Sequence, residues 1–228
     1  MDRAAPLRAR LARARPWPCP ADGLGWREAE LAVIDVETTG LDLRRDEVIS
    51  IGVVPVRHGR IAADRWYQVV RPERAIDPEA VKVHALTPGE LEAAPPLAGV
   101  LPEVRARLRG RVVVAHAAWV ERAFLDRALA PSRERLPKEL VDTAALARAA
   151  GVRRLATHEP DLELLARDLD LPVHTPHHAL GDALTTAQVL LVLATRLEAA
   201  AGDSADRDPG EPALTVRDLL RLTRRHSR

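Results

Sequence analysis

Three short apolar runs between residues 31 and 70 predict strands. Residues 31–40, LAVIDVETTG, begin with an almost continuous apolar stretch, which is typical of a strand buried on both faces. Further strands are predicted at 48–56 and 61–70, and a charged turn containing Gly59 separates them. Because no helical pattern interrupts these three strands, we expect an antiparallel meander.

The middle of the chain alternates helical periodicity with brief apolar runs. A short helix is expected over 79–86, and buried strands over 111–115 and 140–143. Apolar residues recur at helical spacing in four longer stretches, 97–108, 121–130, 161–169 and 179–200. Strands that alternate with helices favour parallel pairing. The expected fold class is therefore α/β, with a mixed sheet (the antiparallel meander plus parallel strands) flanked by helices.

The predicted elements divide the chain into three parts. Residues 1–28 are rich in Arg, Ala and Pro, show no sustained period and are interpreted as an N-terminal extension. Residues 29–200 contain every predicted core element and form one domain. Residues 201–228 are interpreted as a linker followed by a basic C-terminal tail, in which leucines alternate with arginines.

The composition indicates more about the core and the cellular environment of the protein than about its activity. With 228 residues, 46% hydrophobic but only 3% aromatic, the core must be built from aliphatic side chains. The net charge of +1 gives no overall signal for nucleic acid, so any basic footprint must be local. Cys19 is the single cysteine, which excludes an internal disulfide and fits a reducing compartment. We identify no membrane span or secretory signal, so a cytoplasmic protein without a membrane partner is expected.

Candidate chemistry begins at Asp35 and Glu37. Their spacing of two on a strand points both carboxylates to the same side. Two such anions repel each other unless a cation lies between them, and carboxylate oxygens suit Mg²⁺ or Mn²⁺. On this pair alone, ordinary charges at the solvent end of a strand are an equally good interpretation.

Two further clusters lie where apolar elements end. His116 follows the strand at 111–115, and Glu121 comes five residues later. His177 and Asp182 are also five apart, a spacing that puts them off one helical face. His177 is therefore expected on the loop before the last predicted core helix, where it can approach a substrate.

In this order the motifs resemble the DEDD exonuclease superfamily in its DEDDh branch, which includes proofreading epsilon subunits, RNase T and oligoribonuclease. The resemblance covers about 170 residues and implies a ribonuclease H-like fold. It rests on IDVETTGLD from residue 34, VHALT from 83, VDT from 141 and HHALGDALTTA from 177. The second motif departs from the family pattern, because Glu121 replaces the usual Asp and Ala117 replaces an Asn that helps to hold substrate.

The resemblance implies a two-metal site with two Mg²⁺ or Mn²⁺ ions. Asp35 would bind both ions, and Glu37 and Asp182 would bind the ion that carries the attacking water. Glu121 would support the other ion through water. His177 would act as general base, because an imidazole can accept a proton at neutral pH.

The resemblance also implies a substrate-binding segment and partners. Thr38, Thr39, Gly40 and Leu41, together with His84, would hold the terminal nucleotide. The partner would be the 3′ end of a single-stranded nucleic acid, and DNA and RNA remain equally open. A DNA polymerase is a further candidate partner, although no polymerase-binding segment is recognisable in the sequence.

Two functions follow from these features. The first is a metal-dependent 3′→5′ exonuclease that hydrolyses phosphodiester bonds by a two-metal mechanism. The altered second motif keeps an alternative open, in which a degenerate nuclease fold binds nucleic-acid ends or a polymerase without cutting.

Overall fold

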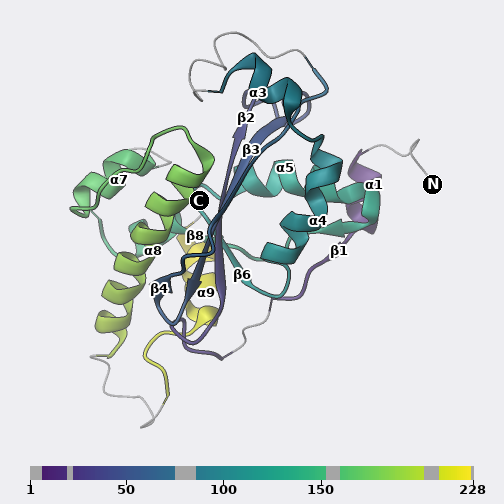
Figure 1. The fold of residues 1–228 in the computed structure, drawn as a ribbon. Helices are drawn as coiled ribbons and strands as arrows, with labels where there is room; N and C mark the ends of the chain where they lie inside the picture. Colours follow the sequence, from purple (N-terminus) through teal and green to yellow (C-terminus); the bar gives the residue numbers. More distant parts are fainter. Residues whose placement is uncertain (1–6, 20–22, 75–85, 153–159, 203–210, 227–228) are drawn as a thin grey trace.

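The structure, a computed structural model, describes residues 7–19, 23–74, 86–152, 160–202 and 211–226 (Figure 1). Its main sheet has the order β4-β3-β2-β6-β8, and β5 also pairs with β3. β2 runs antiparallel to β3 and parallel to β6, which is parallel to β8. The expected fold class is thus confirmed. The strand bounds are β2 Leu31–Thr38, β3 Val48–Arg57, β4 Arg60–Ile61, β5 Trp66–Val69, β6 Val112–Ala115 and β8 Val141–Asp142.

Helices cover both faces of this sheet, as Figure 1 shows for α8 on one side and for α4 and α5 on the other. Alternate residues of β2 point to opposite faces, so Leu31 and Val33 pack on the α8 side while Ala32 and Ile34 pack on the α5 side. The helices are α1 Leu7–Arg13, α3 Pro88–Ala93, α4 Leu97–Leu108, α5 Trp119–Leu129, α6 Thr143–Ala149, α7 Leu162–Asp168, α8 Ala179–Gly202 and α9 Val216–His226.

Two expected boundaries differ in the structure. The third strand of the meander is broken into β4 and β5, which both pair with β3. Thr87, expected near the end of a helix over 79–86, instead begins α3 through a capping box with Glu90. Most of the expected helix lies outside the described residues, because only Leu86 of that range is described.

Segments beyond the predicted domain boundaries also pack against the domain. In the N-terminal extension, β1 (Arg15–Pro16) pairs with β7 (Glu134–Arg135), and Trp26 is fully buried. Beyond residue 200 the sequence predicts a linker and tail, whereas the structure places α9 against α6 and β8. The reason is that the leucines of α9 fall on one helical face, which completes the core on the α8 side.

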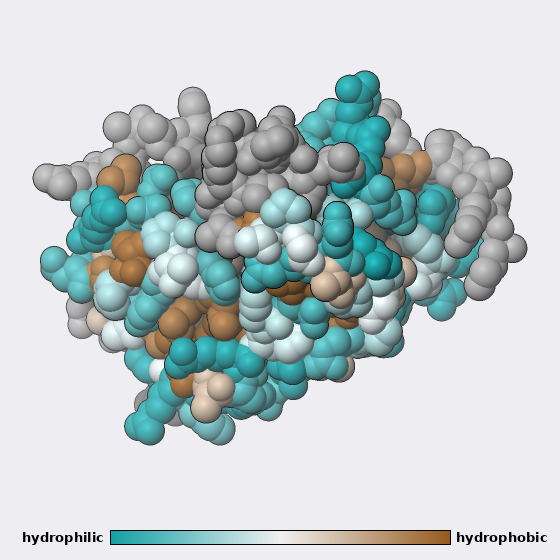
Figure 2. Space-filling view, turned by 45° about the horizontal axis from the view of Figure 1, so that its top comes forward, coloured by the Kyte–Doolittle hydropathy of each residue, from teal (hydrophilic) through white to brown (hydrophobic). Residues whose placement is uncertain are grey.

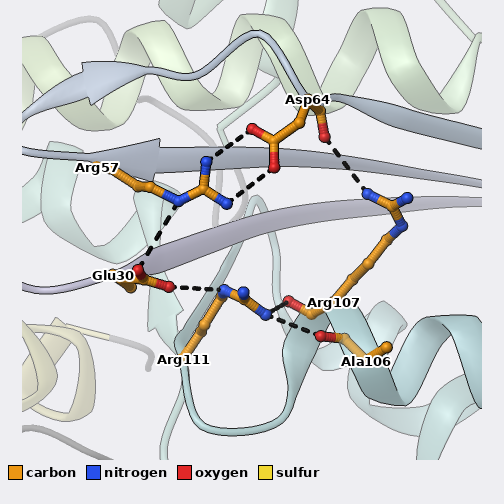
Figure 3. A network of polar contacts seen from close by, with 6 residues as sticks. All are labelled: Glu30, Arg57, Asp64, Ala106, Arg107 and Arg111. Atoms are coloured by element: carbon orange, nitrogen blue, oxygen red, sulfur yellow. Dashed lines mark hydrogen bonds and ion pairs between the residues drawn. The ribbon is translucent and has the colours of Figure 1, made fainter.

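An ion-pair network lies at the end of the sheet where β2 begins (Figure 3). Arg57 makes a bidentate pair with Asp64, at 2.7 and 2.8 Å, and the Arg57 guanidinium lowers the pKa of that carboxyl to about 2. Glu30 lies between Arg57 and Arg111, and Arg111 also donates to two carbonyls of α4. The network therefore joins the β3–β4 hairpin to the helix layer, about 20 Å along β2 from its carboxyl end.

α8 is apolar enough to resemble a membrane span, although no span is expected from the sequence. Its 24 residues have a mean hydropathy of 1.3 in the most apolar window, enough by length and composition to cross a membrane. Its small and aliphatic residues are instead buried against β2, β3 and α6, which identifies it as a core helix. On the face in Figure 2 the apolar residues form separate patches among hydrophilic ones, with no continuous apolar belt.

Candidate active site

Three carboxylates converge at the carboxyl end of β2. Asp35 and Glu37 come from that strand and Asp182 from the first turn of α8, and one oxygen of each lies within 4.8 Å of the others. The cluster forms because the odd-numbered residues of β2 face the helix layer that contains α8. The structure thus brings together three of the four predicted metal ligands.

The environment of these carboxylates disfavours their ionised forms. Burial raises the pKa of Asp35 well above its usual value, and the charges of Glu121, Glu37 and Asp182 raise it further. Burial, followed by the charge of Glu37, also raises the pKa of Asp182, to about 7. A divalent cation among these oxygens would relieve this mutual repulsion, so the donor set fits a hard metal ion.

Glu121, the fourth predicted ligand, lies in the first turn of α5 and is only 3% exposed. Its charge is the largest electrostatic influence on the pKa of Asp35, so the two carboxylates are close. Glu121 is not part of the group of oxygens within 4.8 Å. It therefore lies near Asp35 but outside this group.

His177 lies on the loop directly before α8, as the spacing predicted. Its backbone N–H donates to Asp182 Oδ2 at 2.9 Å, its side chain is exposed, and its φ is +58°. Few residues other than glycine adopt this left-handed conformation, so the turn is held by its surroundings. The structure thus ties His177 directly to one carboxylate of the cluster.

A comparison with family models decides what kind of domain contains this site. The model described as Exonuclease, that of the RNase T family, matches residues 32–190, which include all four acids and His177. The chain belongs to this exonuclease family.

Individual relatives agree with this exonuclease assignment. The chain is 35% identical over 151 residues to the DNA polymerase III epsilon subunit of Treponema pallidum, covering 65% of this chain and 69% of that subunit. It is 33% identical over 175 residues to the PolC-type DNA polymerase III of Thermotoga maritima. That match covers 75% of this chain but only 12% of the polymerase, so the chain spans a small part of such relatives.

Solved exonuclease structures share the fold. Exonuclease X, solved in complex with 5′-overhanging duplex DNA, superposes with a TM-score of 0.60 at 26% identity, covering 85% of this chain and 99% of its own. The nuclease domain of 3′hExo, a DEDDh family member bound to rAMP, has a TM-score of 0.63. At 19% identity, covering 75% of this chain and 94% of that domain, the second likeness shows the fold alone.

His116 and Asp142 of the exonuclease domain make hydrogen bonds to neighbouring segments of the chain. His116 Nε2 donates to the Pro160 carbonyl at 2.6 Å, and its Nδ1 lies 2.9 Å from Thr143 Oγ1. Asp142 accepts the backbone N–H groups of Ala117, Ala118 and Ala144. Asp142 therefore fixes the turn that precedes α5, and sequence reasoning gave it no such task.

That turn contains the main departure from the family pattern. Ala117, which occupies the position of the family asparagine, has a φ of +53°. Asparagine adopts this left-handed region more readily than alanine. The backbone at this position thus has a conformation that asparagine favours, whereas the side chain of Ala117 has no amide group.

The predicted substrate segment forms a tight turn after β2. Thr38 Oγ1 donates to the Gly40 carbonyl at 2.7 Å, and Thr39 Oγ1 donates to Asp46 Oδ1 at 2.8 Å. A Cβ on Gly40 would lie 2.6 Å from Asp46 Oδ2, so a contact within the protein accounts for this glycine. Leu41 is 70% exposed and available to a ligand. His84 lies outside the described residues.

Proposed function

We propose that this exonuclease removes nucleotides from the 3′ end of single-stranded nucleic acid and depends on Mg²⁺ or Mn²⁺. The observation that carries the proposal is the convergence of Asp35, Glu37 and Asp182 within 4.8 Å in a domain of the exonuclease family. A phosphodiester resists hydroxide because both are negative, and two bound ions would activate the water and stabilise the leaving oxygen.

The residues of the chain then have separate tasks. Asp35, on which the charges of Glu121, Glu37 and Asp182 all act, would bind both ions, while Glu37 and Asp182 would bind the first. Glu121, which lies outside the group of three but acts on Asp35 through its charge, would support the second ion through water. His177 would accept the proton of the attacking water, a role supported by its backbone contact with Asp182 of the cluster.

Labelled oligonucleotides test this function directly. The protein is incubated with single strands labelled at the 3′ or 5′ end, with Mg²⁺ or Mn²⁺ and with EDTA. We expect mononucleotides to be released from the 3′ end with either ion and none with EDTA. Asp35→Asn should abolish the release, whereas Asp64→Asn, at the far end of the sheet, should preserve it. Folded wild-type protein that releases nothing with either ion would refute the proposal.

A second candidate is a binding module that holds a nucleic-acid end or a polymerase without cutting. It is favoured by the altered turn, in which Ala117 lacks the amide and Glu121 is longer than the family aspartate. Oligonucleotide binding that persists in EDTA, with no turnover in either metal, would favour this candidate. Hydrolysis that EDTA abolishes would exclude it.

The relatives suggest a partner and a location for this exonuclease. The epsilon and PolC-type relatives are named as parts of bacterial DNA polymerase III, so we propose a DNA polymerase as partner and the cytoplasm as location. DNA and RNA both remain candidate substrates. Rates on matched DNA and RNA strands of the same sequence, measured side by side, decide between them.

A further inference from the structure

A row of residues crosses the sheet at the level of the acidic cluster. Asp35 of β2 is in register with Gly52 of β3, and Gly52 is in register with Tyr67 of β5. Residues paired in this way point to the same face of a sheet. Tyr67 therefore lies on the same face as Asp35, two strands and about 10 Å away.

Gly52 leaves a notch in this row, and the start of α8 fills it. A Cβ on Gly52 would lie 2.3 Å from the Ala179 carbonyl oxygen, so no other residue fits there. In the same first turn of α8, a Cβ on Gly181 would lie 2.4 Å from the His174 carbonyl oxygen. Both glycines allow close backbone contact, which places the first turn of α8 directly on β3 and on its own preceding loop.

His178 extends this contact to the edge of the sheet. Its imidazole stacks on the Tyr67 ring, with centroids 4.3 Å apart and planes 25° from parallel. Burial is the main cause that raises the pKa of the Tyr67 phenol, so the phenol remains neutral. The Gly181 N–H also points to His178 Nδ1, at 3.4 Å. These contacts hold the His178 ring on the side of α8 where β5 lies.

We propose that His178 is a positioning residue, which by stacking on Tyr67 fixes the turn that carries His177 beside the Asp35, Glu37 and Asp182 cluster. This inference rests on the proposed function, because it assigns the base to His177. His177 itself is exposed and left-handed, and its described tie is a single backbone contact with Asp182. The neighbouring ring on Tyr67 supplies the anchor that this turn needs.

The position also explains why two adjacent histidines have different tasks. In the sequence His178 is the neighbouring alternative to His177 as general base, although only His177 has the spacing of the family motif. In the structure its ring is packed flat against Tyr67, with one nitrogen facing the Gly181 N–H. His177 is the exposed member of the pair, whereas His178 is half-buried.

The test removes and restores the ring stack while kcat and KM are measured on one oligonucleotide. Tyr67→Ala and His178→Ala should each lower kcat about 10- to 100-fold, with KM changed less than about twofold, because misplacing a reacting group slows the chemical step. Tyr67→Phe and His178→Phe keep a stacking ring and should recover most of the rate. The double alanine variant should be no slower than either single one, since both remove the same contact.

Hydrogen exchange of residues 173–182 gives a second readout that does not need activity. Exchange there should accelerate in Tyr67→Ala and return to the wild-type rate in Tyr67→Phe. The matched control is Trp66→Ala, a neighbour on β5 that packs in the other core cluster and should leave this exchange unchanged.

The outcomes separate this inference from the proposed function. If wild-type protein releases no nucleotides, the exonuclease proposal fails. The exchange rates then remain as the test of whether the stack of His178 on Tyr67 fixes the turn. If wild-type protein cleaves and both alanine variants match its kcat, the positioning task is refuted and the exonuclease stands. Unchanged exchange at 173–182 in Tyr67→Ala would refute it in either case.

Discussion

Asp182→Asn should stabilise the metal-free protein, and only above acidic pH. The pKa of Asp182 is raised to about 7, so the folded state holds its proton more tightly than the unfolded state, where the value is ordinary. As pH rises from about 4 to 7, the unfolded state loses this proton first, and the stability of the wild type falls. Asparagine has no charge to develop, so the variant escapes this loss.

The size of the effect follows from the pKa. A shift of roughly three units corresponds to at most about 4 kcal/mol. Asp182 is partly solvated, so water screens its charge and about 2 kcal/mol is a reasonable expectation. For a domain of this length that raises Tm by roughly 4–8 °C. The amide oxygen of asparagine can still accept the His177 N–H, so the turn before α8 should persist.

Thermal unfolding by circular dichroism, in EDTA at pH 4 and pH 8, measures this directly. We expect Asp182→Asn to unfold at a higher temperature than the wild type at pH 8 and at nearly the same temperature at pH 4. Adding Mn²⁺ at pH 8 should raise the Tm of the wild type much more than that of the variant, because the ion binds the ionised carboxylate. Asp142→Asn is the control. Asp142 accepts backbone N–H groups, so removing its charge should not raise the Tm of the protein at either pH.

A lower Tm for Asp182→Asn than for the wild type in EDTA at pH 8 would contradict the reasoning. An equal gain at pH 4 and pH 8 would do so as well, because the repulsion requires ionised carboxylates. Either result would mean that the three oxygens do not share one electrostatic site.

Three further perturbations test other parts of the structure. Glu121→Ala should lower the rate of nucleotide release at least about 10²-fold, which corresponds to about 2.7 kcal/mol of activation barrier. Asp126→Asn on the same helix can still accept the Leu136 N–H and should keep a rate near that of the wild type. Equal rates for Glu121→Ala and the wild type with both metals would show that Glu121 is not part of the site. Ala117→Gly should raise the free energy of unfolding by about 1 kcal/mol in urea titrations, because glycine adopts the positive φ without strain, and a loss of stability would mean that this turn is not strained. Leu219→Ala in α9 should cost about 2–5 kcal/mol, because the side chain is fully buried in the core, whereas exposed Arg221→Ala should change stability little; equal effects would show that α9 is not part of the folded domain.

The sequence by itself determined the elements whose signals are local. The apolar run at 31–38 is a buried strand, and the spacing of two puts Asp35 and Glu37 on one face of it. Asp161 caps α7 by accepting the Leu164 N–H, and aspartate is a residue type that favours this position. These features depend on the strand period and on capping chemistry, both of which act over a few residues.

Only the tertiary structure decided the features that join distant segments. Asp142 and the turn before α5 are 24 and 25 residues apart, and no spacing rule links them. The sequence of α9 predicts a basic tail, whereas in the structure α9 packs against α6 and β8 and its leucines join the core. Tyr67 gave no signal in the sequence, because its stack on His178 depends on the register of β3 and β5 and on the glycine notch that seats α8. Pairing register and helix docking are set by burial across the whole domain, which a local pattern does not contain.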